Sequence, residues 1–305
     1  WDTCPKDWII SNFPNVKLYR KFWRTENASR NISHLKKFWE NKGLNKRIMY
    51  AGGNRIFLKS AWKNEVPKPD FFQNKQLSMS KRMQKKHLHW QSIVLKNADF
   101  VTVTSPSLKQ KFKLINTNCK LLTNGYESLL KGIQSESFSI VYTGVMKAIQ
   151  NPENLWKVLG ELVRENNDFA SDFSIHLIGD FDETISKNIL SEGLQVHSTF
   201  YEYMPKSSLE PYITSAHMLL MVSVNDEDSY QIIPGKLFEY MVSGRPILAM
   251  GPQGSDFASI IQSTNTGVFF NYQEKTALKA KILNWFHDYQ SGQLKTNPVG
   301  LEQYS

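Results

Sequence analysis

The chain has 305 residues, of which 41% are hydrophobic, enough for one large domain or two ordinary domains with real cores rather than disorder. No stretch approaches the roughly 18 consecutive apolar residues of a membrane span. The only two cysteines, Cys4 and Cys119, exclude a disulfide framework and predict a reducing compartment.

Charge is divided unevenly along the chain. Residues 1–136 hold 26 Lys and Arg against 9 Asp and Glu, a net charge of +17, whereas residues 137–305 hold 11 against 19, a net charge of −8. Such a split predicts two domains with different partners. The basic half suits an anionic surface such as a membrane face, and it equally fits a lysine-rich solvated surface. No recognised nucleic-acid motif accompanies it, so we expect no nucleic-acid partner.

The first half has the weaker pattern. Its predicted elements are strands at residues 7–13 and 47–50, a lysine-rich helix at 78–97, a buried strand within 97–105, a helix at 107–113 and a strand at 120–122. These elements indicate the later part of an α/β domain. The first strand and glycine loop that usually open such a domain are not recognisable, which predicts an incomplete N-terminal domain.

The second half alternates regularly between strand and helix. Strands are predicted at 138–143, 173–178, 217–224, 246–250 and 267–270, and helices at 152–165, 205–215, 234–243, 255–262 and 274–289. This alternation predicts a parallel sheet covered on both faces, a Rossmann-like domain. With a polar linker around Gly132, the predicted organisation is an N-terminal domain at 1–132, a C-terminal domain at 133–290 and a tail at 291–305.

Glycines end two of the predicted strands. Gly144 and Gly179 each follow a buried run, and Lys147 lies three residues after the first glycine. Ligands of open α/β sheets bind beyond the carboxyl ends of the strands, so these positions predict ligand contacts. Both glycines also fit ordinary turns, and Lys147 a solvated side chain.

A third loop enters a helix through "IPGK". Pro234 is favoured at a first helical position, and Gly235 allows a ligand close to the backbone. The helix N-terminus with Lys236 suits phosphate. Glu239 lies one turn, about 5.4 Å, further on, where a carboxylate can accept two hydrogen bonds from a ribose diol. The pattern therefore predicts a nucleoside diphosphate site. The alternative is a structural Glu239, exposed or paired with Arg245 or Lys236.

The stretch "IPGKLFEYMVSGRPILA" closely resembles the donor-site signature of the glycosyltransferases of family 4, which have the GT-B fold. The likeness extends to "IVYTGVMKAIQNPENL", "IHLIGDF", "YMPKSSLEPYITSAHMLLM" and "NADFVTVTSPSLKQKF". It implies two Rossmann-like domains facing across a cleft, with nucleotide-sugar bound by the C-terminal domain and acceptor by the N-terminal one. It also implies sugar transfer with retention of anomeric configuration, without a metal or other cofactor.

The resemblance also assigns roles. Glu239 would hold the ribose, Lys147 and the Gly144 loop would meet the diphosphate, and Tyr203 and Met204 would flank the base. Lys147 and Glu239 are thus the predicted catalytic residues. The rest of the predicted donor site comprises Gly179, Gln231, Ile233, Pro234, Gly235 and Lys236. The helix at 274–289 would pack at the domain junction, with the tail crossing back.

The chain departs from the family's pattern in places. Gln231 stands eight residues before Glu239, near where the family often has a second glutamate. Gln150 and Asn151 follow Lys147 where a second basic residue is usual. His87 and His89 are acceptor-side candidates by residue type alone, in a lysine-rich helix where a solvated role is the alternative.

We therefore expect a glycosyltransferase acting on a glycan, a lipid-linked intermediate or a protein, in a surface polysaccharide or glycoprotein pathway. Its expected location is cytoplasmic, peripheral at the inner face of the membrane. Two alternatives remain open at this point. One is a non-catalytic GT-B subunit that binds a partner protein or glycan, and the other is a sugar-nucleotide epimerase of the same fold.

Overall fold

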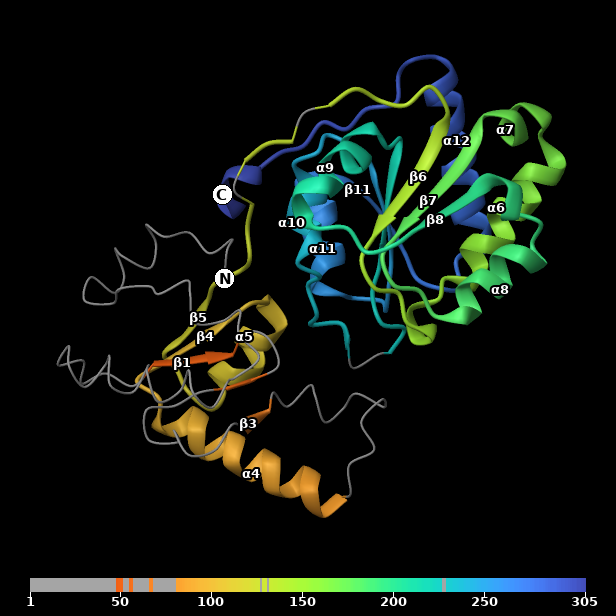
Figure 1. Ribbon diagram of the computed structural model, residues 1–305. Helices are drawn as coiled ribbons and strands as arrows, with labels where there is room; N and C mark the ends of the chain where they lie inside the picture. Colours follow the sequence, from red (N-terminus) through yellow and green to blue (C-terminus); the bar gives the residue numbers. More distant parts are fainter. Residues whose placement is uncertain are drawn as a thin grey trace. The chain divides into compact units, whose positions relative to one another are not determined.

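The computed structural model divides into two compact units, residues 1–125 with Ser305 and residues 126–304 (Figure 1). The described residues are 48–51, 55–56, 66–67, 81–126, 128–130, 132–226 and 229–305. The strand predicted at residues 7–13 lies outside them. The predicted domain boundaries stay predictions.

In the N-terminal unit a parallel three-stranded sheet has the order β1-β4-β5. Its strands are β1 (Ile48–Ala51), β4 (Phe100–Val103) and β5 (Cys119–Leu121). Helix α4 (Lys81–Asn97) and helix α5 (Pro106–Lys113) supply the rest of a small apolar core. A short antiparallel pair, β2 (Arg55–Ile56) and β3 (Val66–Pro67), completes the described elements. The parallel α/β pattern predicted for this half is confirmed.

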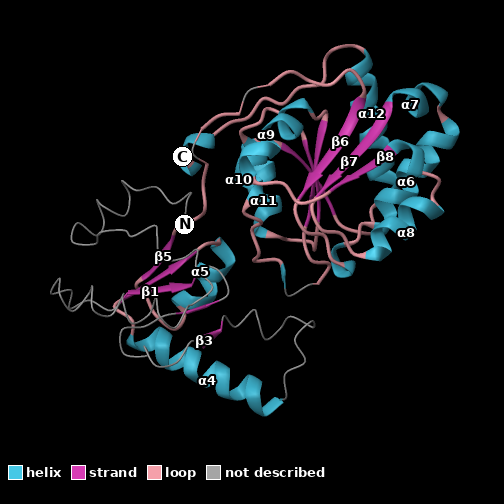
Figure 2. Cartoon of the chain, in the orientation of Figure 1, coloured by secondary structure: helices cyan, strands magenta, loops and turns pink. Residues whose placement is uncertain are grey.

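The C-terminal unit is built on a six-stranded sheet with the order β11-β10-β9-β6-β7-β8 (Figure 2). All the neighbouring strands pair in parallel. The strands are β6 (Phe138–Thr143), β7 (Phe173–Ile178), β8 (Ser198–Tyr201), β9 (Met218–Val222), β10 (Ile247–Met250) and β11 (Gly267–Phe270). The first strand of the unit is central and the chain then winds outward in both directions, which is the strand order of a Rossmann fold.

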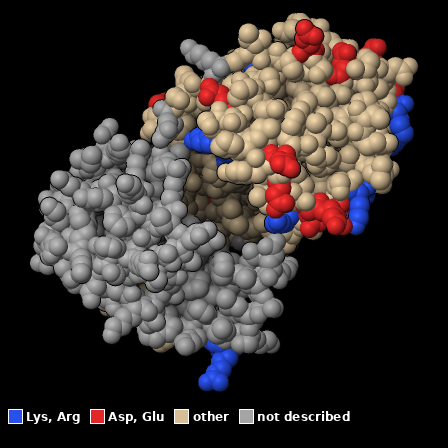
Figure 3. Space-filling model, viewed as in Figure 1, with Lys and Arg blue, Asp and Glu red and all other residues tan. Residues whose placement is uncertain are grey.

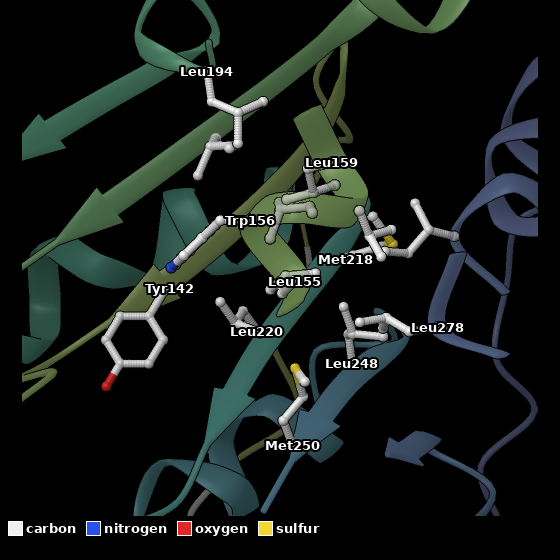
Figure 4. Close-up of a cluster of buried hydrophobic side chains, with 14 of the residues drawn as sticks. Tyr142, Leu155, Trp156, Leu159, Leu194, Met218, Leu220, Leu248, Met250 and Leu278 are labelled. Carbon is white, nitrogen blue, oxygen red and sulfur yellow. The ribbon is translucent and has the colours of Figure 1, made fainter. Parts of the chain in front are cut away.

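Helices cover both faces of this sheet because its strands are apolar on both sides. One core lies against α6 (Glu153–Glu165), α7 (Asn167–Asp172), α8 (Glu183–Ser191) and α12 (Lys275–Gln290). Figure 4 shows part of it, with Trp156 and Leu159 of α6 among strand residues such as Leu220 and Leu248. The other core lies against α9 (Lys206–Ser215), α10 (Lys236–Met241) and α11 (Asp256–Thr264).

Two segments beyond the sheet also lie on the C-terminal unit. The amide of Tyr126 donates to the carbonyl of Tyr304 at 2.9 Å, and the amide of Leu130 donates to that of Val242 at 3.2 Å. The tail is held by Val299, whose amide donates to Thr264 at 2.9 Å. The segment that enters the unit, Tyr126 with residues 128–130, is called the entering segment. It and the tail run together over the face that α10 covers.

Charged side chains of both signs are interspersed over the C-terminal unit on the face drawn in Figure 3. Much of the lysine-rich first half lies outside the described residues. Within the described part of the chain, no helix combines the length and apolar character needed to cross a membrane.

A buried histidine joins β6 to β9 at the edge of the sheet opposite the strands' carboxyl ends. The Nδ1 atom of His217 accepts from the amide of Ser139 at 3.4 Å, and the amide of His217 donates to the carbonyl of Ser139 at 3.1 Å. The His217 side chain also packs edge-on against Tyr289. Burial, helped by the positive charge of Arg245, lowers the pKa of His217 to about 4.

This histidine predicts a loss of stability in mild acid. The pKa of His217 is lowered on folding, so the unfolded chain binds more protons between about pH 6.5 and pH 4, and stability falls as pH drops through that window. Near pH 5 the loss from this residue is about 2 kcal/mol. Urea unfolding from pH 7.5 to 5 measures it, with His217→Gln expected to have the shallower pH dependence. Parallel curves for the two proteins would contradict this account.

Candidate functional site

The strand order of the C-terminal unit reverses between β6 and β9. The chain leaves β6 toward β7 on one side and returns to β9 on the other. In open α/β sheets ligands bind outside the carboxyl ends of the strands at such a switch point. The residues that follow Thr143 and Val222 therefore flank the candidate site.

Two glycine turns meet at this edge of the sheet. The amide of Gly144 donates to the carbonyl of Ile178 at 2.8 Å, and the amide of Gly179 donates to that of Tyr201 at 3.0 Å. Both glycines have positive φ, +114° at Gly144 and +134° at Gly179. A Cβ on Gly179 would lie 2.2 Å from the carbonyl oxygen of Gly144. Positive φ is therefore a structural reason for both glycines, and close packing a second one for Gly179, separate from any ligand.

Lys147 extends from the first glycine turn to the second. Its Nζ lies 3.1 Å from Oδ2 of Asp180, the residue after Gly179. Both side chains are more than half exposed, so the pair is weak and its cation can change partners. The structure thus brings Lys147 together with Gly144 and Gly179.

Lys236, the first residue of α10, reaches the same turn from that helix. Its Nζ donates to the carbonyl of Thr143 at 2.8 Å and lies 3.4 Å from the centre of the Tyr142 ring. It would lie 3.8 Å from a Cβ on Gly144. Burial lowers the pKa of Lys236 well below its usual range. The sequence predicted a charge available to phosphate, whereas here the amine is tied to the end of β6.

A tyrosine makes the second tie between α10 and β6. The hydroxyl of Tyr240 accepts from the amide of Thr143 at 3.0 Å and lies 3.1 Å from its Oγ1. Burial raises the pKa of Tyr240 to about 12, so its hydroxyl keeps its proton at neutral pH. Lys236 and Tyr240 together fix α10 against the strand whose end forms the glycine turn.

Glu239 lies between these two residues in sequence, but its carboxylate contacts a different element. Its Oε1 is 2.8 Å from Nζ of Lys206, the first residue of α9. Neither partner expected from the sequence makes this contact, because Lys236 is bound to Thr143 and Arg245 donates to the carbonyls of Thr214 and Gly132. The Glu239 side chain is 25% exposed, which leaves part of it open to a ligand.

A cavity of about 320 Å³ lies beside this carboxylate. The cavity is lined by Tyr126, Ser128, Leu130, Lys206, Ser207, Glu210, Ile213, Glu239 and Val242. Its wall therefore combines the entering segment, the start of α9 and α10. Within the described residues no group of three or more His, Cys, Asp or Glu could hold a metal ion, and the predicted metal-free reaction stays a prediction.

The loop between β9 and α10 contains two buried polar atoms with no hydrogen-bond partner in the described structure. They are Oγ of Ser223 and Oε1 of Gln231, in side chains that are 2% and 3% exposed. An unsatisfied buried acceptor is costly, and such atoms often mark ligand sites. Gln231 thus lies in the loop where the sequence placed it, with no partner for its Oε1 in the described structure.

The remaining predicted residues are more dispersed. Tyr203 is 81% exposed, whereas Met204 and Ile233 pack partly against the core below α9 and α10. The sequence placed the helix at 234–243, but α10 begins at Lys236, with Gly235 capping it and Pro234 in the preceding turn. The helix tip is therefore two residues later than expected.

The histidine candidates lie in α4 of the N-terminal unit. His89 is exposed there, and the surroundings of the His87 side chain lie outside the described residues. Their acceptor-side role stays a prediction.

Sequence reasoning missed the partners of the predicted residues rather than the residues themselves. Lys206, Asp180 and Tyr240 each contact a predicted site residue or its strand. Asp180 follows directly after Gly179, so its place at the sheet edge was readable from the strand pattern. Lys206 is 33 positions from Glu239, and no local signal links them.

Comparison with known proteins identifies the C-terminal unit. A family model described as "Glycosyl transferases group 1" matches residues 137–288. This part of the chain belongs to the group 1 glycosyltransferases. The matched range contains all the strands of the six-stranded sheet. None of the curated proteins matches the chain.

Solved structures agree with the group 1 assignment at the level of fold. HepE of Anabaena in complex with UDP aligns with a TM-score of 0.60 at 12% identity, over 87% of this chain and 69% of HepE. WaaG, a glycosyltransferase involved in lipopolysaccharide biosynthesis, aligns with a TM-score of 0.54 at 11% identity, over 91% and 78%.

Sucrose-phosphate synthase of Thermosynechococcus elongatus aligns with a TM-score of 0.54 at 19% identity, over 72% of this chain. The chain spans 57% of the length of that synthase. Identities this low show the fold alone, and the predicted GT-B fold class is confirmed.

The two glycine turns of the group 1 domain make a matched pair for mutation. Gly144→Ala forces a side chain into a positive-φ backbone, at a cost of about 1–3 kcal/mol. Gly179→Ala bears the same kind of strain and in addition a 2.2 Å contact with the Gly144 carbonyl oxygen, so we expect the larger loss of stability. Urea unfolding of both variants measures the difference. Equal losses would show that the turns are not packed as described.

Proposed function

We propose that the protein transfers a sugar from a nucleoside diphosphate sugar to an acceptor. The observation that carries the proposal is the position of Glu239, whose carboxylate lines a cavity between α9, α10 and the entering segment of a group 1 glycosyltransferase domain. The short helix that holds it is tied by Lys236 and Tyr240 to the end of β6. A carboxylate and a glycine turn are thus held at a fixed separation.

In this proposal the donor spans the two features. Its ribose diol donates to Glu239, which as a carboxylate accepts two hydrogen bonds. Its diphosphate lies toward the Gly144 turn, where Lys147 exchanges Asp180 for a phosphate oxygen. The HepE structures support the donor class, because one is a complex with UDP and another a complex with UDP and glucose.

The chemistry follows from the leaving group. As the bond between sugar and diphosphate breaks, negative charge grows on the diphosphate oxygens. A cation already placed at the turn stabilises that charge without rearrangement. Lys147 is the exposed cation there, whereas the amine of Lys236 is bound to the carbonyl of Thr143 and holds the turn in place. Retention of configuration, without metal or cofactor, belongs to the proposal through the resemblance to family 4.

The acceptor in this proposal is a glycan or a lipid-linked intermediate. The involvement of WaaG in lipopolysaccharide biosynthesis supports that class. In this proposal the basic N-terminal half binds an anionic membrane surface, and the enzyme meets its acceptor there.

A second candidate is a non-catalytic subunit that binds a glycan or a partner protein. Gln231 favours it, because a neutral amide stands near the family's second carboxylate and its Oε1 has no partner in the described structure. Donor-dependent release of nucleoside diphosphate separates the two functions. The enzyme releases it in the presence of acceptor, and the binding subunit does not.

The first prediction for the site concerns Glu239→Gln. The amide keeps one acceptor but loses the charge, and hydrogen bonds to a charged group are worth about 1.5–3 kcal/mol, so donor affinity should fall roughly ten- to a hundredfold. Thermal shift with UDP, ADP and GDP selects the nucleotide, and titration calorimetry measures the loss.

A matched control is Glu165→Gln, which breaks a pair with Lys279 at 2.8 Å between α6 and α12, the helices on the other face of the sheet from α10. It should leave nucleotide affinity unchanged. If Glu239→Gln keeps full affinity and only the melting temperature drops, the carboxylate is structural and the proposed donor site is wrong.

The second prediction concerns the membrane. Because residues 1–136 carry a net charge of +17, the protein should sediment with vesicles of acidic phospholipid and not with phosphatidylcholine vesicles. Binding should weaken with added salt, since exposed charges are screened beyond about 8 Å at physiological ionic strength. Equal sedimentation with both kinds of vesicle would refute the anionic-surface proposal.

A further inference from the structure

The pair between Lys206 and Glu239 joins two helices that are each anchored independently. Lys206 is the first residue of α9, and that helix is fixed by the buried Ile213 and by the bond from Arg245 to the carbonyl of Thr214. Glu239 lies on α10, which is held to β6. Neither backbone needs to move for the 2.8 Å contact to form.

The pair is also unequal in exposure. The Lys206 side chain is 63% exposed and that of Glu239 is 25% exposed. Both residues line the same cavity, so the more exposed lysine meets a carboxylate that is largely buried but still open to the cavity. An exposed ion pair adds little to stability, so the effect to consider for this pair is on what the cavity binds.

A single contact of this kind restricts the carboxylate. The last torsion of a glutamate side chain is broad, so an isolated carboxylate samples many orientations. Lys206 occupies Oε1, and a carboxylate has about four acceptor positions, so Oε2 and part of Oε1 remain for a ligand. A vicinal diol needs both of its hydroxyls aimed at one carboxylate, and it therefore benefits from a fixed orientation.

The charge of Lys206 acts in the same direction. A nucleoside diphosphate carries its negative charge close to its ribose, so an unneutralised Glu239 would repel the ligand that it has to bind. A cation at 2.8 Å offsets that repulsion.

We propose that Lys206 is a positioning residue of the donor site, which orients the Glu239 carboxylate toward the ribose diol and offsets its charge. This inference rests on the proposed donor site. In this inference Lys206 and Glu239, on different helices, together produce the preference for a ribose over a 2′-deoxyribose. The opposite role would be a plug, in which Lys206 competes with the ligand for the carboxylate.

The test uses the full chain and measures selectivity for the diol. Calorimetry gives the affinities of UDP, ADP and GDP and of their 2′-deoxy forms for the unchanged protein, Lys206→Gln and Lys206→Arg. For the nucleotide that binds, the unchanged protein should prefer the ribose form by about tenfold or more. In Lys206→Gln that preference should fall below about threefold, and Lys206→Arg should restore most of it.

Lys279→Gln is the matched control, because it breaks lysine–glutamate pairs of similar length between α12 and α6, on the other face of the sheet. It should leave the preference for the ribose form intact, because none of the residues of those pairs lines the cavity.

The outcomes separate this inference from the proposed function. If Glu239→Gln abolishes the ribose preference and Lys206→Gln leaves it unchanged, the positioning role is wrong and the donor site stands. Tighter binding by Lys206→Gln would show a plug and also overturn the inference. If none of the six nucleotides binds the unchanged protein, the donor site and the positioning role fail together.

Discussion

Burial of strand β6 on both faces is the constraint on which the C-terminal unit depends. All six of its residues are buried, so the strand itself can present no polar group to a ligand. Any chemistry at the centre of the sheet has to come from the turn after Thr143 and from elements tied to it. Helix α10 is tied there twice, through Lys236 and Tyr240, and the position of Glu239 follows from those two contacts.

The cations of the site already have partners. Lys147 lies against Asp180, Lys206 against Glu239, and Lys236 against the carbonyl of Thr143. In the proposed donor complex only Lys147 exchanges its partner, while Lys206 stays on Glu239 and Lys236 stays on Thr143. The lysines therefore have different roles. The exposed Lys147 can move from Asp180 to a ligand, whereas the buried Lys236 fixes the shape of the turn.

The regular part of the fold could be read from the sequence because burial on both faces gives continuous apolar runs. The strand at 138–143 and the strand at 173–178 match β6 and β7 residue for residue. Strand β8 was missed because its residues are exposed or half-buried and carry no such run. Helices α7 and α8 were missed with it.

The candidate site was readable only in part, for a related reason. Gly144, Gly179 and Glu239 stand at positions that a strand–turn–helix pattern marks locally. Their partners come from other elements, and side-chain pairing between α9 and α10 depends on packing that no local pattern encodes. The sequence could likewise name Lys236 as a cation near the site, but it could not show that the amine is directed under the turn and onto the Tyr142 ring.

A crystal structure with a bound nucleoside diphosphate tests the central claim most directly, using whichever of UDP, ADP and GDP stabilises the protein most. The account predicts both ribose hydroxyls within hydrogen-bond distance of the Glu239 carboxylate, with the diphosphate toward the Gly144 turn and Lys147 turned from Asp180 to a phosphate oxygen. A nucleotide bound elsewhere, with Glu239 still in contact only with Lys206, would contradict it.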